Sequence, residues 1–184
     1  MTKAELRLTG SGGQGVILAT VILAEAAFLD KKHVVQSQSY GPEARGGMCK
    51  AEVIVDEKPI TYTKVQKPNF LLALTQQSLD KFSASLSDDA IVMVDSSLDV
   101  PESLKRSHRV YEVPILDTAV NKVGRSITAN IVAIGAINEV LHLASPQALM
   151  KGVGMHIPKG SEELNMRALE EGMNLITPSL SRAS

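Results

Sequence analysis

The fold is decided by Gly10-Ser11-Gly12-Gly13-Gln14-Gly15, a glycine-rich run near the start of the chain. It follows the alternating segment Glu5–Thr9, which predicts a strand, and it precedes the apolar segment Val16–Phe28, which predicts a helix. Between a strand and a helix, Gly-x-Gly-x-x-Gly is typical of a phosphate-binding turn. In such a turn we expect Gly10 to permit the tight bend, Gly12 to let a ligand approach the backbone, and Gly15 to let the helix pack close to the strand.

The helix N-terminus behind this turn offers unpaired N–H groups and a partial positive charge, both of which suit a phosphate. The alternative is a tight connection that binds no ligand. A dinucleotide site also needs a carboxylate at the end of the second strand, but His33–Ser39 ends in Gln and Ser, and Asp30 precedes it. A P-loop is excluded because no Gly-Lys-Ser/Thr follows. The run therefore favours phosphate binding over hydride transfer.

Strand and helix patterns alternate along the rest of the chain, which predicts a sheet with helices on its faces. Met48–Val55 predicts a strand that pairs with Pro59–Thr63 as a hairpin across residues 56–58. Further strands are predicted at Phe70–Leu74, Ala90–Val94 and Arg109–Val113, and helices at Gln76–Leu86, Asp117–Val123, Ile127–Leu143, from Ser145-Pro146 onward, and Ser161–Ile176. We expect residues 1–184 to form a single α/β domain. Its Rossmann-like sheet should be mixed but mostly parallel, with helices on both faces and an antiparallel hairpin extension.

The composition excludes several classes of protein. The chain has 184 residues, which suits one domain, and 19 basic against 20 acidic residues give a net charge of -1. Such a balance indicates neither a nucleic acid nor an acidic membrane as partner. No apolar run reaches the roughly 18 residues of a membrane helix, and the N-terminus lacks a signal-peptide pattern, so we expect a cytoplasmic protein. The single cysteine, Cys49, excludes a disulfide framework and an iron–sulfur cluster held by this chain alone.

Two predicted helices are apolar nearly all round. Val16–Phe28 is interrupted only by Thr20 and Glu25, and Ala129–Leu143 contains few polar residues. A surface helix of a small domain normally has one apolar stripe and one polar face. These helices lie either under other helices of the same domain or against another chain. We favour the second interpretation for one or both helices, which predicts a cognate subunit, or a homodimer of the isolated chain.

A second loop, residues 39–47, follows the second predicted strand. Loops at the carboxyl ends of parallel strands line the ligand crevice, so we expect this loop to lie beside the glycine turn. It carries Tyr40, Glu43 and Arg45 among glycine and proline residues. Arg45 can grip a phosphate or carboxylate in a bidentate way, or it can pair with Glu43 and stiffen the loop. Tyr40 and Arg45 therefore join the six residues of the glycine turn as candidate cofactor-binding residues.

Three stretches together resemble one known family. Gly10–Ile17 (GSGGQGVI) and Gln36–Gly47 (QSQSYGPEARGG) resemble the gamma subunit of 2-oxoacid:ferredoxin oxidoreductases, most closely its 2-oxoglutarate or 2-oxoisovalerate branch. Thr128–Ala136 (TANIVAIGA) also fits the long helix of that family. The resemblance covers most of the chain, and the loop after the second strand is its most diagnostic part.

The resemblance implies a division of labour between subunits. Alpha and beta subunits hold thiamine diphosphate and magnesium, and iron–sulfur clusters lie on partner chains, which can include a ferredoxin-like delta subunit. The complex decarboxylates a 2-oxoacid, reduces ferredoxin and transfers the acyl group to coenzyme A. The gamma subunit packs on the others and helps to form the coenzyme A site. It therefore holds no catalytic residue and is inactive alone, and the substrate pocket that selects the 2-oxoacid lies on its partners.

Two other functions remain as hypotheses: a structural subunit that binds no ligand, and an independent dinucleotide-dependent reductase. The reductase is disfavoured because the ribose-binding carboxylate and a Tyr-Lys or His-Asp proton-transfer pair are missing. We expect Cys49 to be buried and unreactive, and the four widely spaced histidines to bind no metal. Asp95 and Asn130 are interpreted as capping residues in preference to ligand contacts.

Overall fold

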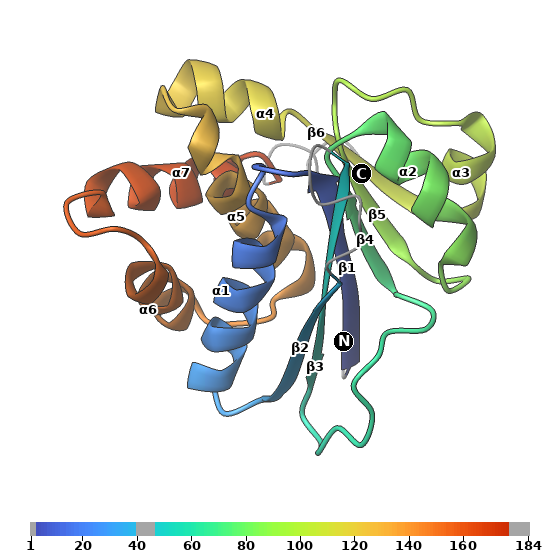
Figure 1. Ribbon diagram of the computed structural model, residues 1–184, viewed down its shortest axis with the longest axis horizontal. Helices are drawn as coiled ribbons and strands as arrows, with labels where there is room; N and C mark the ends of the chain where they lie inside the picture. Colours follow the sequence, from blue (N-terminus) through green and yellow to red (C-terminus); the bar gives the residue numbers. More distant parts are fainter. Residues whose placement is uncertain (1–2, 40–46, 177–184) are drawn as a thin grey trace.

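The computed structural model describes residues 3–39 and 47–176 of the chain. Within these residues the strands form one six-stranded sheet, in the order β2-β3-β1-β4-β5-β6 (Figure 1). The strands are β1 (Lys3–Ser11), β2 (His33–Ser39), β3 (Met48–Asp56), β4 (Phe70–Ala73), β5 (Ile91–Asp95) and β6 (Arg109–Val113). The helices are α1 (Val16–Leu29), α2 (Gln76–Phe82), α3 (Glu102–Ser107), α4 (Ile115–Asp117), α5 (Ala129–Leu141), α6 (Pro146–His156) and α7 (Glu162–Asn174).

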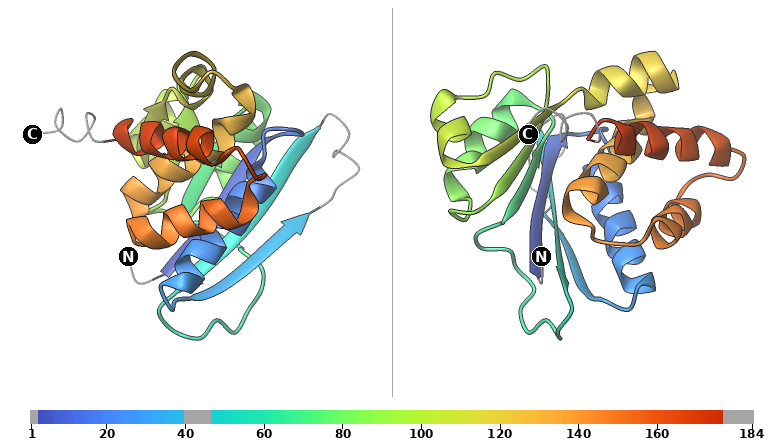
Figure 2. Two further views of the ribbon diagram at one scale, coloured as in Figure 1. Left: turned by 90° about the vertical axis from the view of Figure 1, so that its left-hand side faces the viewer. Right: turned by 180° about the vertical axis from the view of Figure 1, so that it is seen from behind.

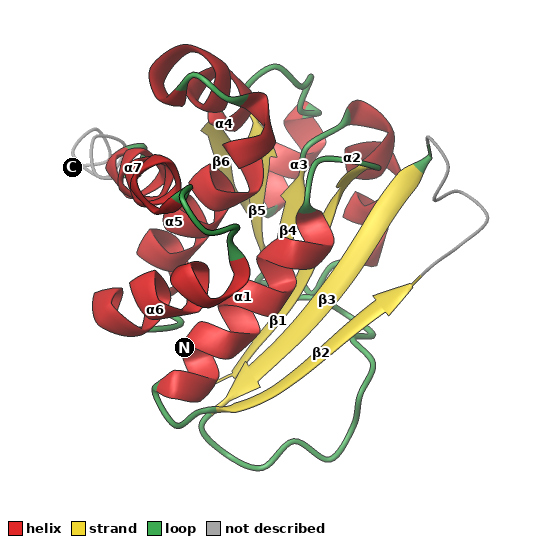
Figure 3. Cartoon of the chain, turned by 60° about the vertical axis from the view of Figure 1, so that its left-hand side comes forward, coloured by secondary structure: helices red, strands yellow, loops and turns green. Residues whose placement is uncertain are grey.

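The sheet is mixed but mostly parallel, as expected. The pairs β1–β4, β4–β5 and β5–β6 are parallel, whereas β3 is antiparallel to both of its neighbours, β1 and β2. Among the described strands, β3 alone therefore runs against the common direction, and Figure 3 shows it lying between β1 and the edge strand β2.

The expected hairpin between Met48–Val55 and Pro59–Thr63 is wrong. Residues 57–69 contain no strand, and β3 forms its antiparallel pairs with β1 and β2 instead. Five consecutive residues of β3, from Ala51 to Val55, are buried, as in a strand with a neighbour on each side. The segment after β3 is mostly exposed, and Pro59 has no N–H to contribute to a ladder. The hairpin of this fold is therefore β2–β3.

Helices cover both faces of the sheet, as the alternation of elements predicts. On one face α1 and α5 form the main core with the sheet, and α6 and α7 pack outside them (Figures 1 and 2). On the other face α2 and α3 bury Leu79 and Leu104 against a smaller cluster on β4 and β5. None of the helices in residues 3–39 and 47–176 is long and apolar enough to cross a membrane.

The burial of α5 decides between the two interpretations of the apolar helices. Every residue from Ala129 to Asn138 is buried within this chain, beneath α7. Of the two helices, α5 is therefore covered by its own chain, and the expectation of a partner rests on α1. Helix α1 is also mostly buried, but Leu18 and Phe28 are 36% and 62% exposed. Only α1 of these two helices keeps an apolar surface for a partner.

Two glycines set the distance between α5 and α7. A Cβ atom at Gly135 of α5 would collide with the carbonyl oxygen of Leu169, and one at Gly172 of α7 would collide with that of Val132. The two backbones therefore touch where a side chain would hold them apart. This contact lets α7 cover α5 closely enough to bury it.

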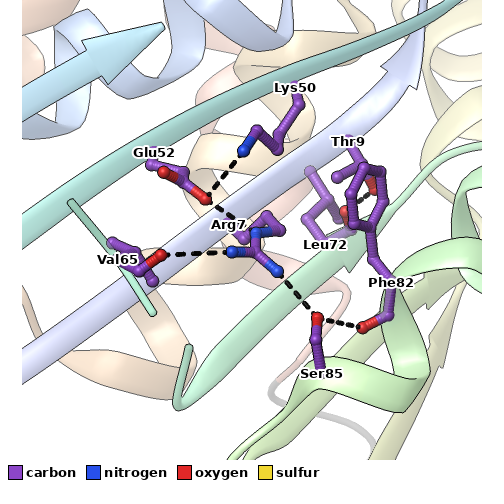
Figure 4. Close-up of polar contacts among 8 residues, drawn as sticks. All are labelled: Arg7, Thr9, Lys50, Glu52, Val65, Leu72, Phe82 and Ser85. Carbon is purple, nitrogen blue, oxygen red and sulfur yellow. Dashed lines mark hydrogen bonds and ion pairs between the residues drawn. The ribbon is translucent and has the colours of Figure 1, made fainter. Parts of the chain in front are cut away.

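A buried ion pair joins β1 to β3 on the face opposite α1 (Figure 4). Arg7 and Glu52 stand opposite each other in the ladder, and Arg7 Nε donates to Glu52 Oε1 at 2.7 Å. The same guanidinium donates to Ser85 Oγ at 2.8 Å and to the Val65 carbonyl at 3.3 Å, while Lys50 Nζ lies 3.3 Å from Glu52 Oε1. Since its donors reach three different segments, Arg7 ties the chain after β3 and the 3-10 turn after α2 to the sheet.

The α5–α7 contact yields a stability prediction. Gly172→Ala should lower the free energy of unfolding by about 1–3 kcal/mol, because its methyl group has no room beside the Val132 carbonyl. The matched control is Gly154→Ala in α6, where a Cβ meets nothing within 4 Å. That control should leave stability unchanged or raise it by up to about 1 kcal/mol. Urea unfolding followed by circular dichroism measures both, and equal stability of the two variants would contradict the prediction.

Candidate functional site

The glycine turn begins later than the sequence pattern suggests. Strand β1 continues through Ser11, so Gly10 pairs with Cys49 and Ser11 pairs with Met48 of β3. The bend therefore lies at residues 12–15, beyond Gly10. Gly10 leaves space for it, because a Cβ there would collide with the side chain of Gln14.

Gln14 holds the turn closed from inside. Its side-chain Oε1 accepts a hydrogen bond from the Ser11 N–H at 2.6 Å, and its backbone N–H donates to the Ser11 carbonyl at 3.2 Å. Its Nε2 reaches the carbonyl of Leu74, just beyond β4, at 3.5 Å. Ser11 and Gln14 thus shape the turn and link it to the sheet. The hydrogen bonds named here join them to their own chain and not to a ligand.

Gly15 occupies the N-cap of α1 with φ 70° and ψ 21°, a left-handed conformation that favours glycine. A Cβ on it would lie 2.7 Å from Nδ2 of Asn130 in α5. Sequence reasoning expected Gly15 to allow close packing of helix on strand. The strand is not the element that comes close to Gly15, because the close approach is between the start of α1 and Asn130 of α5.

Part of the turn presents bare backbone. Gly12 and Gly13 are exposed, and a Cβ at Gly13 would meet nothing within 4 Å. The Gly12 N–H donates to the Gly47 carbonyl at 3.3 Å, whereas the N–H groups of Gly13 and Gly15 have no acceptor among residues 3–39 and 47–176. The first turn of α1 adds further N–H groups without intrahelical partners. This arrangement suits an anion.

One end of the second loop contacts the turn, while residues 40–46 lie outside the described residues, so the expected position of the loop as a whole stays a prediction. Strand β2 ends at Ser39, and Gly47 on the far side of the loop contacts Gly12 through the hydrogen bond just described. Tyr40 and Arg45 lie outside the described residues, so their proposed contacts with a ligand stay predictions.

A cavity of about 420 Å³ opens next to the turn. Gly13 and Gly15 form one side of it, and Asn130 lines it from the start of α5. The surface that lines it is mainly apolar, and it comes from the glycine turn, α1, the 3-10 turn before α5, the start of α5, the end of α6, the connection to α7 and the first turn of α7. The other lining residues are Leu18, Ile127, Thr128, Ile131, His156, Ile157, Pro158, Ser161, Leu164 and Asn165.

The structure tests the interpretation of three isolated polar residues. Asp95 is a capping residue, since its carboxylate accepts from the N–H groups of Ser97 at 3.0 Å and Leu116 at 2.8 Å. Asn130 is not at the N-cap, which is Thr128, but its Oδ1 accepts from the Ile131 N–H at 3.0 Å and so serves one free donor of the first turn. Burial raises the pKa of the Cys49 thiol, which favours its unreactive protonated form.

Comparison with known proteins identifies the family. Residues 5–175 match the family model described as pyruvate ferredoxin/flavodoxin oxidoreductase. The chain belongs to this family. Among its relatives, the 2-oxoglutarate synthase subunit KorC of Methanocaldococcus jannaschii is 41% identical over 172 residues, which cover 92% of each chain.

Solved structures agree with this assignment. The gamma subunit of a keto/oxoacid ferredoxin oxidoreductase from Geobacter sulfurreducens superposes with a TM-score of 0.85 at 42% identity, covering 95% of this chain and 97% of that one. A 2-oxoglutarate:ferredoxin oxidoreductase from Magnetococcus marinus, with 2-oxoglutarate, coenzyme A and succinyl-CoA bound, gives a TM-score of 0.86 at 17% identity, covering 97% of this chain and 32% of that one. At that identity the second match shows the shared fold alone.

The resemblance stated from the sequence motifs is therefore confirmed. The expected α/β fold is confirmed as well, since it is the fold of the Geobacter gamma subunit. The relatives are subunits of 2-oxoacid oxidoreductases, so the hypothesis of an independent dinucleotide-dependent reductase finds no support among them.

The contact between Gly15 and Asn130 can be measured by a double-mutant cycle. Gly15→Ala should destabilise the chain by at least about 1–2 kcal/mol, because an alanine is strained at this φ and its methyl group meets the Asn130 amide. In an Asn130→Ala background only the backbone strain should remain, so the cost of Gly15→Ala should fall. Urea unfolding of the four chains gives the coupling free energy, and an identical cost in both backgrounds would contradict the contact.

Proposed function

We propose that this chain is the gamma-type subunit of a heteromeric 2-oxoglutarate:ferredoxin oxidoreductase and that its glycine turn holds coenzyme A. The complex would oxidatively decarboxylate 2-oxoglutarate, reduce ferredoxin and release the acyl-CoA. The identity to the KorC subunit of a 2-oxoglutarate synthase, over nearly the whole of both chains, supports the choice of 2-oxoacid. The complex is proposed to be cytoplasmic.

One observation carries the coenzyme A proposal: bare N–H groups at Gly13 and Gly15 lie directly before the N-terminus of α1. Phosphate groups bind at such positions, because the N–H groups donate to the oxygens and the helix dipole favours negative charge. The Magnetococcus assembly, which shares this fold, has coenzyme A bound. In our proposal Arg45 and Tyr40 approach the same phosphate from the second loop, and the Arg45 guanidinium provides the charged contact.

The remaining chemistry is assigned to partner chains. Alpha and beta subunits are proposed to hold thiamine diphosphate and magnesium, and the iron–sulfur clusters lie on them or on a ferredoxin-like delta subunit. Within the described residues of this chain, no group of three or more His, Cys, Asp and Glu side chains is arranged to hold a metal. The role of this chain is to bind and orient the acyl acceptor and to pack on its partners, with the exposed Leu18 and Phe28 of α1 as part of the docking surface.

A ligand-free structural subunit is the second candidate. It is favoured by the hydrogen bonds that the turn makes with its own chain, since the N–H groups of Ser11, Gly12 and Gln14 are already paired. In that case the glycines would serve only the tight connection between β1 and α1, and the turn would face a partner subunit.

Kinetics of the complete complex separate these candidates. Gly12→Val places an isopropyl group on the exposed backbone and should block the approach of the phosphate. Arg45→Ala removes a charged contact worth about 1.5–3 kcal/mol, so the KM for coenzyme A should rise roughly tenfold to a hundredfold. Steady-state assays measure it, with Gly154→Ala as the matched control and gel filtration to confirm assembly. An unchanged coenzyme A dependence in both variants would favour the structural candidate.

The division of labour gives a second functional prediction. The purified chain alone should not reduce ferredoxin or a viologen dye with any 2-oxoacid, because the proposal assigns thiamine diphosphate and the clusters to its partners. Adding it to purified alpha and beta chains should raise the rate of acyl-CoA formation, which thioester absorbance measures. Dye reduction by the chain alone, or no gain on addition, would contradict the assignment.

A further inference from the structure

We propose that the loop between β3 and β4 docks an acidic segment of a protein that binds this chain transiently. The loop comprises residues 57–69 and is called the lysine loop below. It lies at the end of the sheet where β1 begins, away from the glycine turn (Figure 1). The inference therefore needs neither the proposed coenzyme A site nor the cavity beside the turn.

The lysine loop is fixed to the sheet although it forms no helix or strand. The Tyr62 hydroxyl donates to Glu5 Oε1 at 2.6 Å, and the Val65 carbonyl accepts from Arg7 at 3.3 Å. At the end of the loop, Asn69 Oδ1 accepts from the Glu5 N–H at 2.8 Å, and the Asn69 N–H donates to the Glu5 carbonyl at 3.0 Å. Ordered loops of roughly this length without secondary structure are uncommon in compact domains and usually have a function. The hydrogen bonds hold the exposed side chains of the loop at defined positions.

A second cavity, of about 380 Å³, lies between the lysine loop and β1. Its lining residues are Glu5, Tyr62, Lys64, Gln66 and Lys67. Glu5 is the one acidic residue of this lining, and it is already engaged, because Lys3 forms an ion pair with it and the Tyr62 hydroxyl donates to it. The hydrogen bond to Glu5 raises the pKa of Lys3, which keeps the ammonium group charged. The carboxylate of Glu5 is therefore neutralised before any partner approaches.

Lys64 and Lys67 leave positive charge uncompensated at this cavity. Both are exposed, and neither forms an ion pair within residues 3–39 and 47–176. Lys58 adds a third exposed cation to the loop, whereas Glu57 is its only acidic residue. Asp88–Asp89, which follows a hydrogen bond to the end of the loop, pairs with no lysine among the same residues. The surface is thus locally positive in a chain whose net charge is -1.

An acidic protein segment complements this surface. Its carboxylates would pair with the lysines, while the Tyr62 ring, which is 38% exposed, and the lysine stems offer it apolar contact. Nucleic acid needs a larger basic face than three lysines provide. Permanent interfaces are more hydrophobic, and lysine is depleted from them, whereas exposed charges mainly accelerate association. The apolar residues Leu18 and Phe28 of α1 therefore suit a permanent subunit, and the lysine loop suits a protein that binds and leaves.

Binding of a labelled acidic peptide to the full chain tests the proposal. The probe is fluorescein-labelled octaglutamate, measured by fluorescence anisotropy at low ionic strength, with octalysine as the peptide of opposite charge. Octaglutamate should bind and octalysine should not, and added salt should weaken binding because it screens exposed charges. Lys64→Glu with Lys67→Glu should raise the Kd roughly tenfold, and Lys64→Gln with Lys67→Gln roughly threefold. Absence of octaglutamate binding at low ionic strength would overturn the proposal.

Lys151→Glu with Lys159→Glu is the matched control. It changes the net charge equally, at exposed lysines on and after α6 that do not line the cavity. The control should leave the Kd for octaglutamate within about twofold, because distant exposed charges are screened. Equal weakening by both pairs of Glu variants would show that the peptide responds to net charge alone, which would overturn the proposal. Circular dichroism confirms that each variant is folded.

Two further measurements separate the acidic protein from other occupants of the loop. A labelled single-stranded oligonucleotide should bind more weakly than octaglutamate, and tighter binding that Lys64→Glu with Lys67→Glu abolishes would assign the loop to nucleic acid. In the assembled complex with alpha and beta chains, octaglutamate should still bind, because a transient partner needs the loop exposed. Loss of that binding on assembly would show that a permanent subunit covers the loop, and the transient assignment would fail.

Discussion

The direct backbone contact between α5 and α7 fixes the two helices that form opposite walls of the candidate site. Gly135 and Gly172 bring each helix against the carbonyls of the other, and α7 can then bury α5. Asn130 at the start of α5 is thereby held against Gly15, and the start of α7 forms the opposite wall of the cavity. A wider separation of α5 and α7 would move both walls. The geometry of the candidate site thus depends on two glycines that do not line it.

The sequence predicted which segments form strands and helices better than it predicted which of these elements lie side by side. The glycine run, the apolar strands and the family motifs together identified a mostly parallel sheet with helices on both faces. The alternation of Met48–Val55 identified a strand, but the partner expected from the nearest segment, Pro59–Thr63, was wrong, because β3 pairs with β1 and β2 instead. The insertion of β3 between them brings Glu52 opposite Arg7, a pairing between residues 45 positions apart that no local pattern contains.

The roles within the candidate site were harder to predict, for a related reason. Gly10 and Gly15 were recognised as necessary, but the groups that fill the space of their absent Cβ atoms are a glutamine and an asparagine from other parts of the chain. Asn130 was assigned to capping, and half of its amide does serve the helix. His156 carried no signal, because a single histidine with no ligand spacing looks the same whether or not its ring faces a cavity. Burial and orientation, which are tertiary properties, separate these cases.

The turn and the cavity would recognise different properties of a ligand: the turn its negative charge, and the cavity its shape. Several N–H groups of the turn are engaged within the chain, so few remain for a phosphate, and these would bind many phosphorylated molecules equally well. Selectivity must therefore come from groups around the turn. Asn130 and His156 line the neighbouring cavity, and the buried His156 Nε2 has no hydrogen-bond partner among the described residues. Any selectivity that the cavity adds to the turn must come from shape and hydrogen bonding, because its lining holds no Asp, Glu, Lys or Arg.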